Sequence, residues 1–327
     1  MPVTILAERY NTLRNEVNLV LGVSNSASPT YGYGQPFSTN SVVGSRSAND
    51  LVNADKVTAQ DYEDLYIDLM RVRSHQVGSS VAIDEFVIGD YEANTETADI
   101  IEESYVLGLE ALADNITTNK FTVDLNNLTI ASLPTASSTR LPTNTWSTII
   151  SHIFTITFDT VVERRHYFNA GGEIRLSASV DYTGSQAKTV DWQTILNAMG
   201  TISFKATETV NNAGVGSSSS IGNYDLTNSY RLVYSRTGGA VYARNRYNIY
   251  AKEYATGNAT SAIQFKVDFI DGQPNDRRFG IDEVVYGTFN SNVAYAVPDS
   301  QITINGTTHD AVVIDTVPVG TRVRPLS

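Results

Sequence analysis

The sequence predicts an α+β protein that is mainly β, with an N-terminal helical module followed by an antiparallel β-sandwich-like region that carries one packed helix. Near the N-terminus, apolar residues recur at steps of three and four, which is typical of amphipathic helices. From about residue 146 the apolar period changes to two, which is typical of half-buried strands. The chain is also rich in Thr, Ser, Asn, Val and Tyr, a composition that favours short strands joined by polar turns.

Two helices are predicted at the N-terminus. The first spans residues 5–21, and Gly22 follows it as a C-terminal cap. The second begins after Thr58, whose hydroxyl can cap it with Asp61 three places on. A long loop rich in turn-forming residues joins them, and its aromatic residues favour an ordered loop. Two such helices bury little by themselves, so their apolar stripes need a partner, either the rest of the chain or another subunit.

A third helix is predicted from about residue 97 to 113. The segment from Asn115 to Thr145 loses periodicity and contains Pro134 and Pro142, which is typical of a connector. These patterns predict a helical docking module over 1–78, a helix and connector over 79–145 and an antiparallel β domain over 146–327. A sub-boundary is considered near 211–223, where the sequence is typical of a flexible loop or linker.

The β region is predicted from alternating apolar positions. One strand carries Ile150, Phe154, Ile156 and Phe158, and another carries Ile174, Leu176, Ala178 and Val180. A helix capped by Asp191 interrupts the strands and ends at Gly200, with its apolar face formed by Trp192, Ile195, Leu196 and Met199. Further strands are expected near Ile202, after a turn at Gly238-Gly239, and around Val284 and Val293.

The stretch ERRHYFNAGGEIRLSASVD, residues 163–181, is the strongest candidate for a chemical site because Arg164, Arg165 and His166 are adjacent. An anion site, a catalytic base and a purely structural role are all consistent with such a cluster. Asn169-Ala170-Gly171-Gly172 supplies the positive φ values of a tight turn, so a β-hairpin is the simplest interpretation. Arg165 would then lie on the opposite strand face from its two neighbours, which weakens a three-residue anion clamp.

Composition and charge exclude several classes of function. The chain has no cysteine, so disulfides, thiolate zinc sites and cysteine nucleophiles are excluded. Its formal net charge of -12, with no run of Lys or Arg, argues against nucleic acid as a partner. No apolar run approaches the ~20 residues that span a bilayer, and the N-terminus is not typical of a secretory signal. A soluble protein without a membrane partner is expected.

No established catalytic motif is found in the sequence. The histidines at 75, 152, 166 and 309 show no ligand spacing, and a structural role is favoured for each. Asp268, Asp271, Asp276 and Asp282 could hold a cation, but they do not match an EF-hand, and Asp271-Gly272 has a sufficient role as a turn. We therefore predict no enzyme, no cofactor and no metal site, with cation binding by the aspartates left open.

Several blocks together resemble a known group of proteins. They are VLG at the end of the first helix, the loop motif YGYGQ, the helix KVTAQDYEDLYIDL ending in RSHQVG, and the later blocks RRHYFNAGGEIRLSASV and DWQTILNAMGTISF. This ordered set is similar to virion structural proteins of contractile-tailed phages, especially those that infect cyanobacteria. The resemblance covers residues 5 to about 209 in blocks. It implies assembly rather than catalysis, and it brings no catalytic residues with it.

The resulting hypothesis is a structural protein of a tailed-phage virion, in the tail, baseplate, fibre-attachment or neck region, assembled in the host cytoplasm. Its expected partners are other virion proteins and copies of itself in a threefold or sixfold homo-oligomer. The alternatives are a virion-borne glycan-binding protein, for which the tyrosines offer stacking surfaces, and a glycan hydrolase. The expected assembly interface lies on the first two helices and their loop: Leu6, Tyr10, Leu13, Val17, Val20, Tyr31, Tyr33, Tyr62, Leu65 and Leu69.

Overall fold

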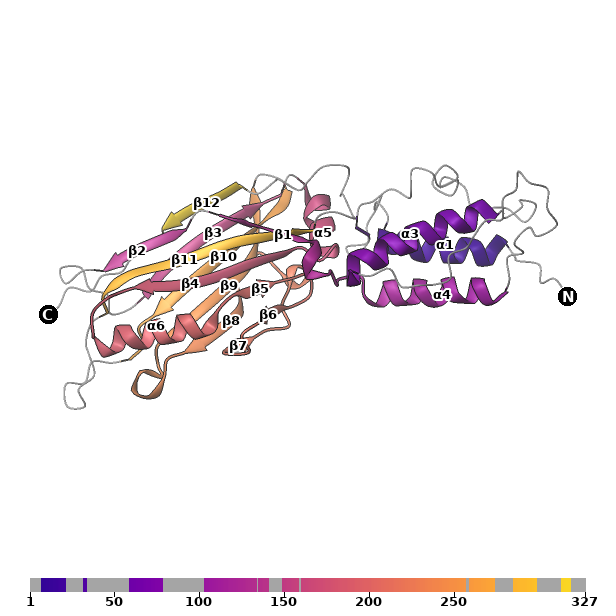
Figure 1. Ribbon diagram of the computed structural model, residues 1–327. Coiled ribbons are helices and arrows are strands. Elements are labelled where there is room, and N and C mark those ends of the chain that lie inside the picture. The colour runs from indigo at the N-terminus through magenta and orange to yellow at the C-terminus, as the bar shows by residue number, and fades with distance from the viewer. Residues whose placement is uncertain are drawn as a thin grey trace. The chain divides into compact units, whose positions relative to one another are not determined.

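The computed structural model describes residues 7–21, 32–33, 59–78, 103–133, 135–140, 149–158, 160–256, 259–273, 285–298 and 313–318. The chain divides into two compact units. The first comprises residues 1–129, 165–171 and 298–309, and the second comprises 130–164, 172–297 and 310–327. The predicted class is confirmed, because a helical unit precedes a unit built from two antiparallel sheets (Figure 1).

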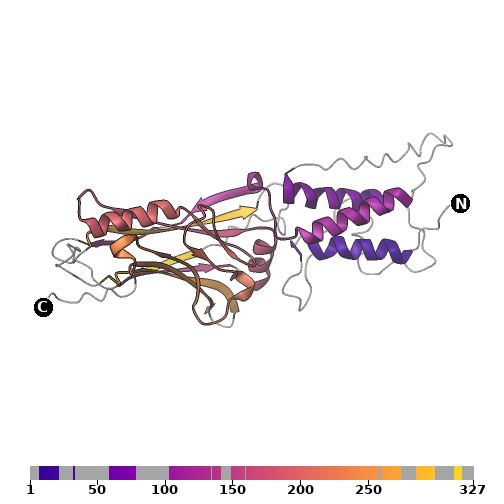
Figure 2. The same ribbon diagram turned by 90° about the horizontal axis from the view of Figure 1, so that it is seen from below.

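Among the described residues of the first unit, the helices α1 (Ala7–Leu21), α3 (Ala59–Val77) and α4 (Glu103–Thr118) lie side by side (Figure 2). Each contacts the other two. The 3.6-residue period of each sequence puts its apolar stripe on the side that faces the other helices. The core that results includes Leu13, Val17, Leu65, Leu69 and Leu109.

The third helix differs from its predicted extent. It continues to Thr118, because Ile116 adds one more buried position to its apolar face. The segment predicted as a connector holds the strands β1 (Leu128–Ser132) and β2 (Ala136–Arg140), so that prediction is wrong for these residues. Positions 97–102, Pro142 and most of the long loop after α1 lie outside the described residues.

Over the residues that the structure describes, the second unit forms two six-stranded sheets. In the first sheet the strand order is β1-β11-β4-β5-β6, with β2 also paired to β11, and in the second it is β12-β3-β10-β9-β8-β7. The remaining strands are β3 (Ile149–Thr157), β4 (Glu173–Asp181), β5 (Ile202–Phe204), β6 (Thr209–Asn211), β7 (Ser217–Ser218), β8 (Arg231–Thr237), β9 (Arg246–Thr256), β10 (Ala259–Ile270), β11 (Gly287–Pro298) and β12 (Val313–Pro318).

The inner faces of the sheets form the core of this unit. Along β3 every second residue is buried, as the period of two predicts. Phe204 of one sheet meets Phe265 of the other with ring centroids 5.1 Å apart, and Phe269 meets Phe289 at the same distance. These contacts are edge-on, the geometry that aromatic rings prefer in packed interiors. The two sheets therefore pack face to face as a sandwich (Figure 2), with aromatic rings in contact between them.

Helix α6 (Ala187–Met199) completes this core. Trp192 lies between the two sheets, 6.0 Å from Phe269 and 5.9 Å from Phe289 between ring centroids. The predicted apolar face is confirmed, since Trp192, Ile195, Leu196 and Met199 are all buried, and Gly200 ends the helix with φ of 63°. The predicted cap is wrong, because the helix begins one turn earlier after Gln186 and Asp191 lies inside it.

Two further predictions change in this unit. Residues 211–223, interpreted as a flexible loop or linker, include the end of β6, strand β7 and the first residue of a 3-10 helix, η3 (Asn223–Asp225). The turn after β8 at Gly238-Gly239 is confirmed and leads into the short η4 (Ala240–Tyr242). Val293 lies in β11 as expected, whereas Val284 is outside the described residues.

Candidate functional site

The predicted hairpin at residues 163–181 is wrong in its first arm. Val161–Asn169 form a helix, α5, and only the second arm is a strand, β4. Thr160 and Glu163 start the helix with a reciprocal cap, in which each backbone N–H donates to the other's side chain, at 3.2 and 3.0 Å. Gly171 has φ of 87°, so the turn between the two elements does use the positive φ that the sequence predicts.

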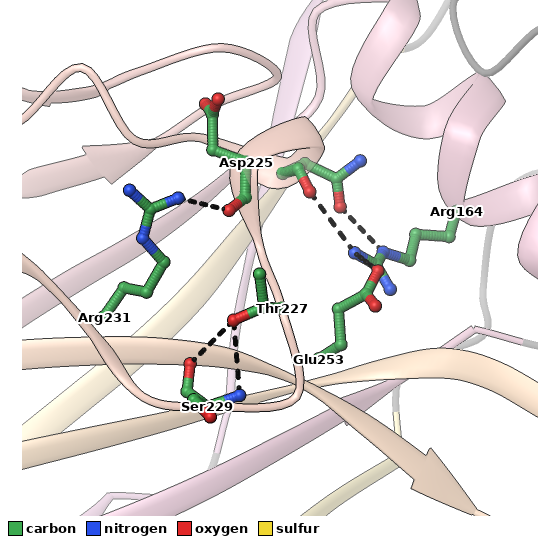
Figure 3. A network of polar contacts seen from close by, with 7 residues as sticks. Arg164, Asp225, Thr227, Ser229, Arg231 and Glu253 are labelled. Atoms are coloured by element: carbon green, nitrogen blue, oxygen red, sulfur yellow. Dashed lines mark hydrogen bonds and ion pairs between the residues drawn. The ribbon is translucent and has the colours of Figure 1, made fainter.

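Arg164 is held inside the second unit (Figure 3). Its Nε donates to Asn223 Oδ1 at 2.7 Å, and its Nη2 lies 3.3 Å from Glu253 Oε1. Burial lowers the pKa of this guanidinium, while Glu253 opposes that shift. Because the cation is already engaged with an amide and a carboxylate, it stabilises the fold rather than an exposed anion site.

The neighbouring residues 225–231 complete the network drawn in Figure 3. Arg231 donates from Nη1 to the backbone oxygen of Asp225 at 2.6 Å. Thr227 Oγ1 accepts the backbone N–H of Ser229 at 3.3 Å. These contacts fix the segment between η3 and β8. Arg165 is half-buried and His166 is fully buried, and both belong to the first unit, whereas Arg164 belongs to the second.

His152 lies between the two sheets. Its Nδ1 is 2.8 Å from Ser291 Oγ and its Nε2 is 2.9 Å from Ser138 Oγ. Burial, assisted by the positive charge of Arg140, lowers the pKa of His152 to about 4. A neutral imidazole with both nitrogens paired to serines holds the sheets together, in agreement with the structural role predicted for it. His309 lies outside the described residues.

The predicted aspartate cluster is only partly described. Asp268 accepts from Ser151 Oγ at 2.6 Å and pairs with Lys266 at 2.8 Å, whereas Asp271 pairs with Lys188 at 2.9 Å. Asp276 and Asp282 lie outside the described residues. Among the residues that the structure covers, no group of three or more His, Asp or Glu side chains is placed to hold a metal ion.

The residues expected to form an assembly interface are covered within the chain itself. Those described are all buried in the core of the helical unit: Tyr10, Leu13, Val17, Val20, Tyr33, Tyr62, Leu65 and Leu69. Leu6 and Tyr31 lie outside the described residues. Of the two expected partners for these stripes, the chain supplies its own, mainly through α4. Exposing these side chains to a second subunit would require the helical core to open.

Three blocks of the resemblance meet in a buried polar junction in the first unit. We define the junction by Tyr33 of YGYGQ, His75 and Gln76 of RSHQVG, and Asn169 and Ala170 of YFNAGG. Gln76 Nε2 donates to Tyr33 Oη at 3.0 Å, and Asn169 Nδ2 donates to the Gly32 oxygen at 2.8 Å. His75 Nε2 lies 2.7 Å from the Ala170 oxygen, and its burial lowers its pKa.

Backbone hydrogen bonds reinforce the junction. The Tyr33 N–H donates to the oxygen of Val20 at 2.7 Å, and the Asp124 N–H donates to the oxygen of His75 at 2.9 Å. The side chain of Gln76 also donates to the oxygen of Ile116, at 2.9 Å. The junction thus joins α1, α3 and α4 to residues 169–170 through fixed polar contacts. The sequence contained each block but no signal that they meet.

A cavity of about 840 Å³ opens in the second unit and was not predicted. It lies where β2, β4 and β11 approach the start of α6. It is lined by Thr139, Arg140, Val180, Asp181, Tyr182, Thr183, Gln186, Gln193, Tyr286, Gly287 and Thr288. Tyr182 and Tyr286 are near-parallel, at an interplanar angle of 13°, with ring centroids 6.4 Å apart. Tyr182 directly follows β4 and Tyr286 directly precedes β11, and no sequence signal indicates that the two rings pair.

Comparisons with protein-family models, with curated proteins and with solved structures found no match to this chain. Within the described part of the chain, no helix is both long and apolar enough to cross a membrane.

Proposed function

We propose that the chain is a structural component of a tailed-phage virion, in the tail, baseplate, fibre-attachment or neck region, and that it acts through protein–protein assembly. The observation that supports this most is the buried junction. The blocks that resemble virion proteins supply its side chains, and those side chains hold helices and connecting segments together. Blocks used for architecture favour a structural protein over an enzyme.

The outer face of the second sheet offers a surface for assembly. Leu232, Tyr250 and Lys266 lie in one row across β8, β9 and β10, as the strand register shows. Leu232 is 43% exposed, and Lys266 Nζ lies 4.4 Å from the centroid of the Tyr250 ring. Tyrosine is enriched at protein interfaces because its ring is apolar and its hydroxyl can hydrogen-bond. This face replaces the buried helical stripe as the surface through which self-association is proposed.

Self-association is tested by light scattering on the purified chain. We expect a mass of three or six chains, and we expect Leu232→Asp to lower it, because a charge on the row opposes burial of this face. The matched control is Leu125→Asp, since Leu125 is 72% exposed and lies in η2 (Leu125–Asn127), outside the row. A single-chain mass for the wild-type protein would contradict the homo-oligomer. An unchanged mass for Leu232→Asp would contradict this face.

A second candidate function is glycan binding, which the tyrosine-lined cavity favours. Aromatic rings that are half-buried beside polar groups suit sugar rings, which have apolar faces and polar edges. It does not compete with assembly, because one virion component can do both.

A further inference from the structure

The cavity of the second unit has a fixed aromatic wall. Tyr182 and Tyr286 are both half-buried, so each ring combines packed and accessible surface. Gln193 Nε2 donates to the backbone carbonyl oxygen of Tyr182 at 2.8 Å, and the backbone N–H of Gln186 donates to the Tyr182 hydroxyl at 3.2 Å. The Tyr286 N–H donates to Thr189 Oγ1 at 3.1 Å. Both tyrosines are thus anchored to the first turns of α6, so the wall is formed before any ligand binds.

Arg140 gives the cavity an unsatisfied positive group. Only 8% of this residue is exposed, and its Nη1 donates to the Thr139 oxygen at 2.9 Å. Its Nε and Nη2 are buried and have no hydrogen-bond partner within the described residues. Buried donors are normally satisfied, because an unmet donor has lost its water without gaining a protein partner, and the cost is greater for a charged group. Two unmet donors on one guanidinium beside a cavity match the bidentate pattern in which arginine binds a carboxylate.

Asp181 supplies the opposite chemistry in the same cavity. Its side chain is exposed, and its Oδ2 accepts from Asn290 Nδ2 at 2.8 Å. A carboxylate held in this way retains lone pairs that can accept hydrogen bonds from hydroxyl groups. Arg140 and Asp181 are the charged groups among the lining residues. The lining therefore combines an aromatic wall, a cationic donor and an anionic acceptor.

We propose that this cavity binds an acidic sugar residue of a polysaccharide, a pyranose that carries a carboxylate. The sugar ring packs on the Tyr182 and Tyr286 wall, its carboxylate pairs with Arg140 and its hydroxyls donate to Asp181. A neutral sugar leaves Arg140 unpaired, and a small inorganic anion leaves the aromatic wall uncovered. This binding rests on the glycan-binding function proposed for the same cavity and not on a role in the virion.

The test is isothermal titration calorimetry of the full chain with a trisaccharide of galacturonic acid. The matched neutral probe is its methyl ester, which keeps the ring but removes the charge, and acetate is the anion-only probe. We expect a dissociation constant below about 1 mM for the acid and binding at least tenfold weaker for the ester and for acetate. Equal binding of the ester would overturn the acidic specificity. If acetate bound as tightly as the acid, the sugar ring would not contribute to recognition. If the acid did not bind, the cavity would not be a site for acidic sugars.

Substitutions of the lining residues test whether the ligand binds in the cavity. Arg140→Gln and Tyr286→Ala should each weaken binding of the acid at least tenfold. Arg140→Gln should also remove the preference for the acid over its ester. Tyr254→Ala is the matched control, because Tyr254 is also partly exposed but lies on β9 and does not line the cavity. Circular dichroism checks the fold, and if Arg140→Gln does not fold, Tyr286→Ala and Asp181→Asn decide. Unchanged affinity in the folded variants would overturn the proposal.

Discussion

Lys188 and Asp271 form an ion pair in the interior of the second unit. Their side chains are 0% and 1% exposed, and Nζ lies 2.9 Å from Oδ2. The ammonium also donates to the Gln273 oxygen at 3.3 Å. Burial raises the pKa of Asp271, and the adjacent Lys188 opposes that shift. The pair fixes α6 to the end of β10, although its net contribution to stability is limited by the cost of removing two charges from water.

Removing one partner of this ion pair should destabilise the protein more than replacing both partners by apolar residues. Lys188→Met should lower the free energy of unfolding by roughly 3–5 kcal/mol, because Asp271 is left buried without its partner. Adding Asp271→Leu should restore most of that loss. The control is Lys205→Met, which removes an ion pair with an exposed lysine and should cost less than about 1 kcal/mol. Urea denaturation measures all four proteins, and equal losses for the single and double variants would contradict the account.

His152 should make the stability of the second unit depend on pH. Its pKa falls from 6.5 to about 4 on folding, so between these values the unfolded chain binds a proton that the folded chain does not. His152 therefore contributes to the free energy of unfolding in full above pH 6.5, and this contribution is lost as the pH falls toward 4. The shift in pKa corresponds to roughly 3 kcal/mol. Urea denaturation at several pH values should show a shallower dependence for His152→Gln. Equal dependence in both proteins would refute the assignment.

At the scale of elements, strands were easier to predict than the short helix α5. The alternation along β3 and β4 is local, and one buried face imposes it, so the sequence shows it directly. Helix α5 has no comparable stripe, because Val161 and Val162 are exposed while Tyr167 and Phe168 are buried. The sequence does contain a capping box, Thr160-Val-Val-Glu163, that indicates a helix start. The double glycine that follows favours a hairpin turn more strongly, so the helix is not predicted.

The turn after α5 can be tested with two glycines of the first unit. A Cβ at Gly171 would lie 2.5 Å from Val123 Cγ1, and its φ of 87° is unfavourable for a side chain. Gly171→Val should therefore cost more than about 1 kcal/mol. At Gly108, inside α4, a Cβ meets nothing within 4 Å, so Gly108→Ala should add about 0.5–1 kcal/mol. The midpoint of thermal unfolding, followed by circular dichroism, should fall for Gly171→Val and rise for Gly108→Ala. A Gly171→Val protein as stable as wild type would contradict the turn.

At the scale of the whole molecule, the contacts between distant segments could not be predicted. Tyr33 and Gln76 are 43 positions apart, and Asn169 and Gly32 are 137 positions apart. Apolar periodicity shows that a face is buried but not what covers it, so the stripes of α1 and α3 are consistent with cover by another subunit or by the chain itself, and the structure shows that α4 covers them. The cavity could not be predicted for the same reason, because its lining comes from β2, β4, α6, β11 and the residues that flank them.

We propose that the chain is a structural component of a tailed-phage virion. Electron microscopy of purified phage particles, labelled with an antibody raised against the chain, tests it most directly. Particles that lack the gene serve as the control for nonspecific labelling. We expect label at one fixed position in the tail, baseplate, fibre-attachment or neck region of intact particles. Particles that carry no label, while the chain is present in the infected cell, would contradict a structural role in the virion.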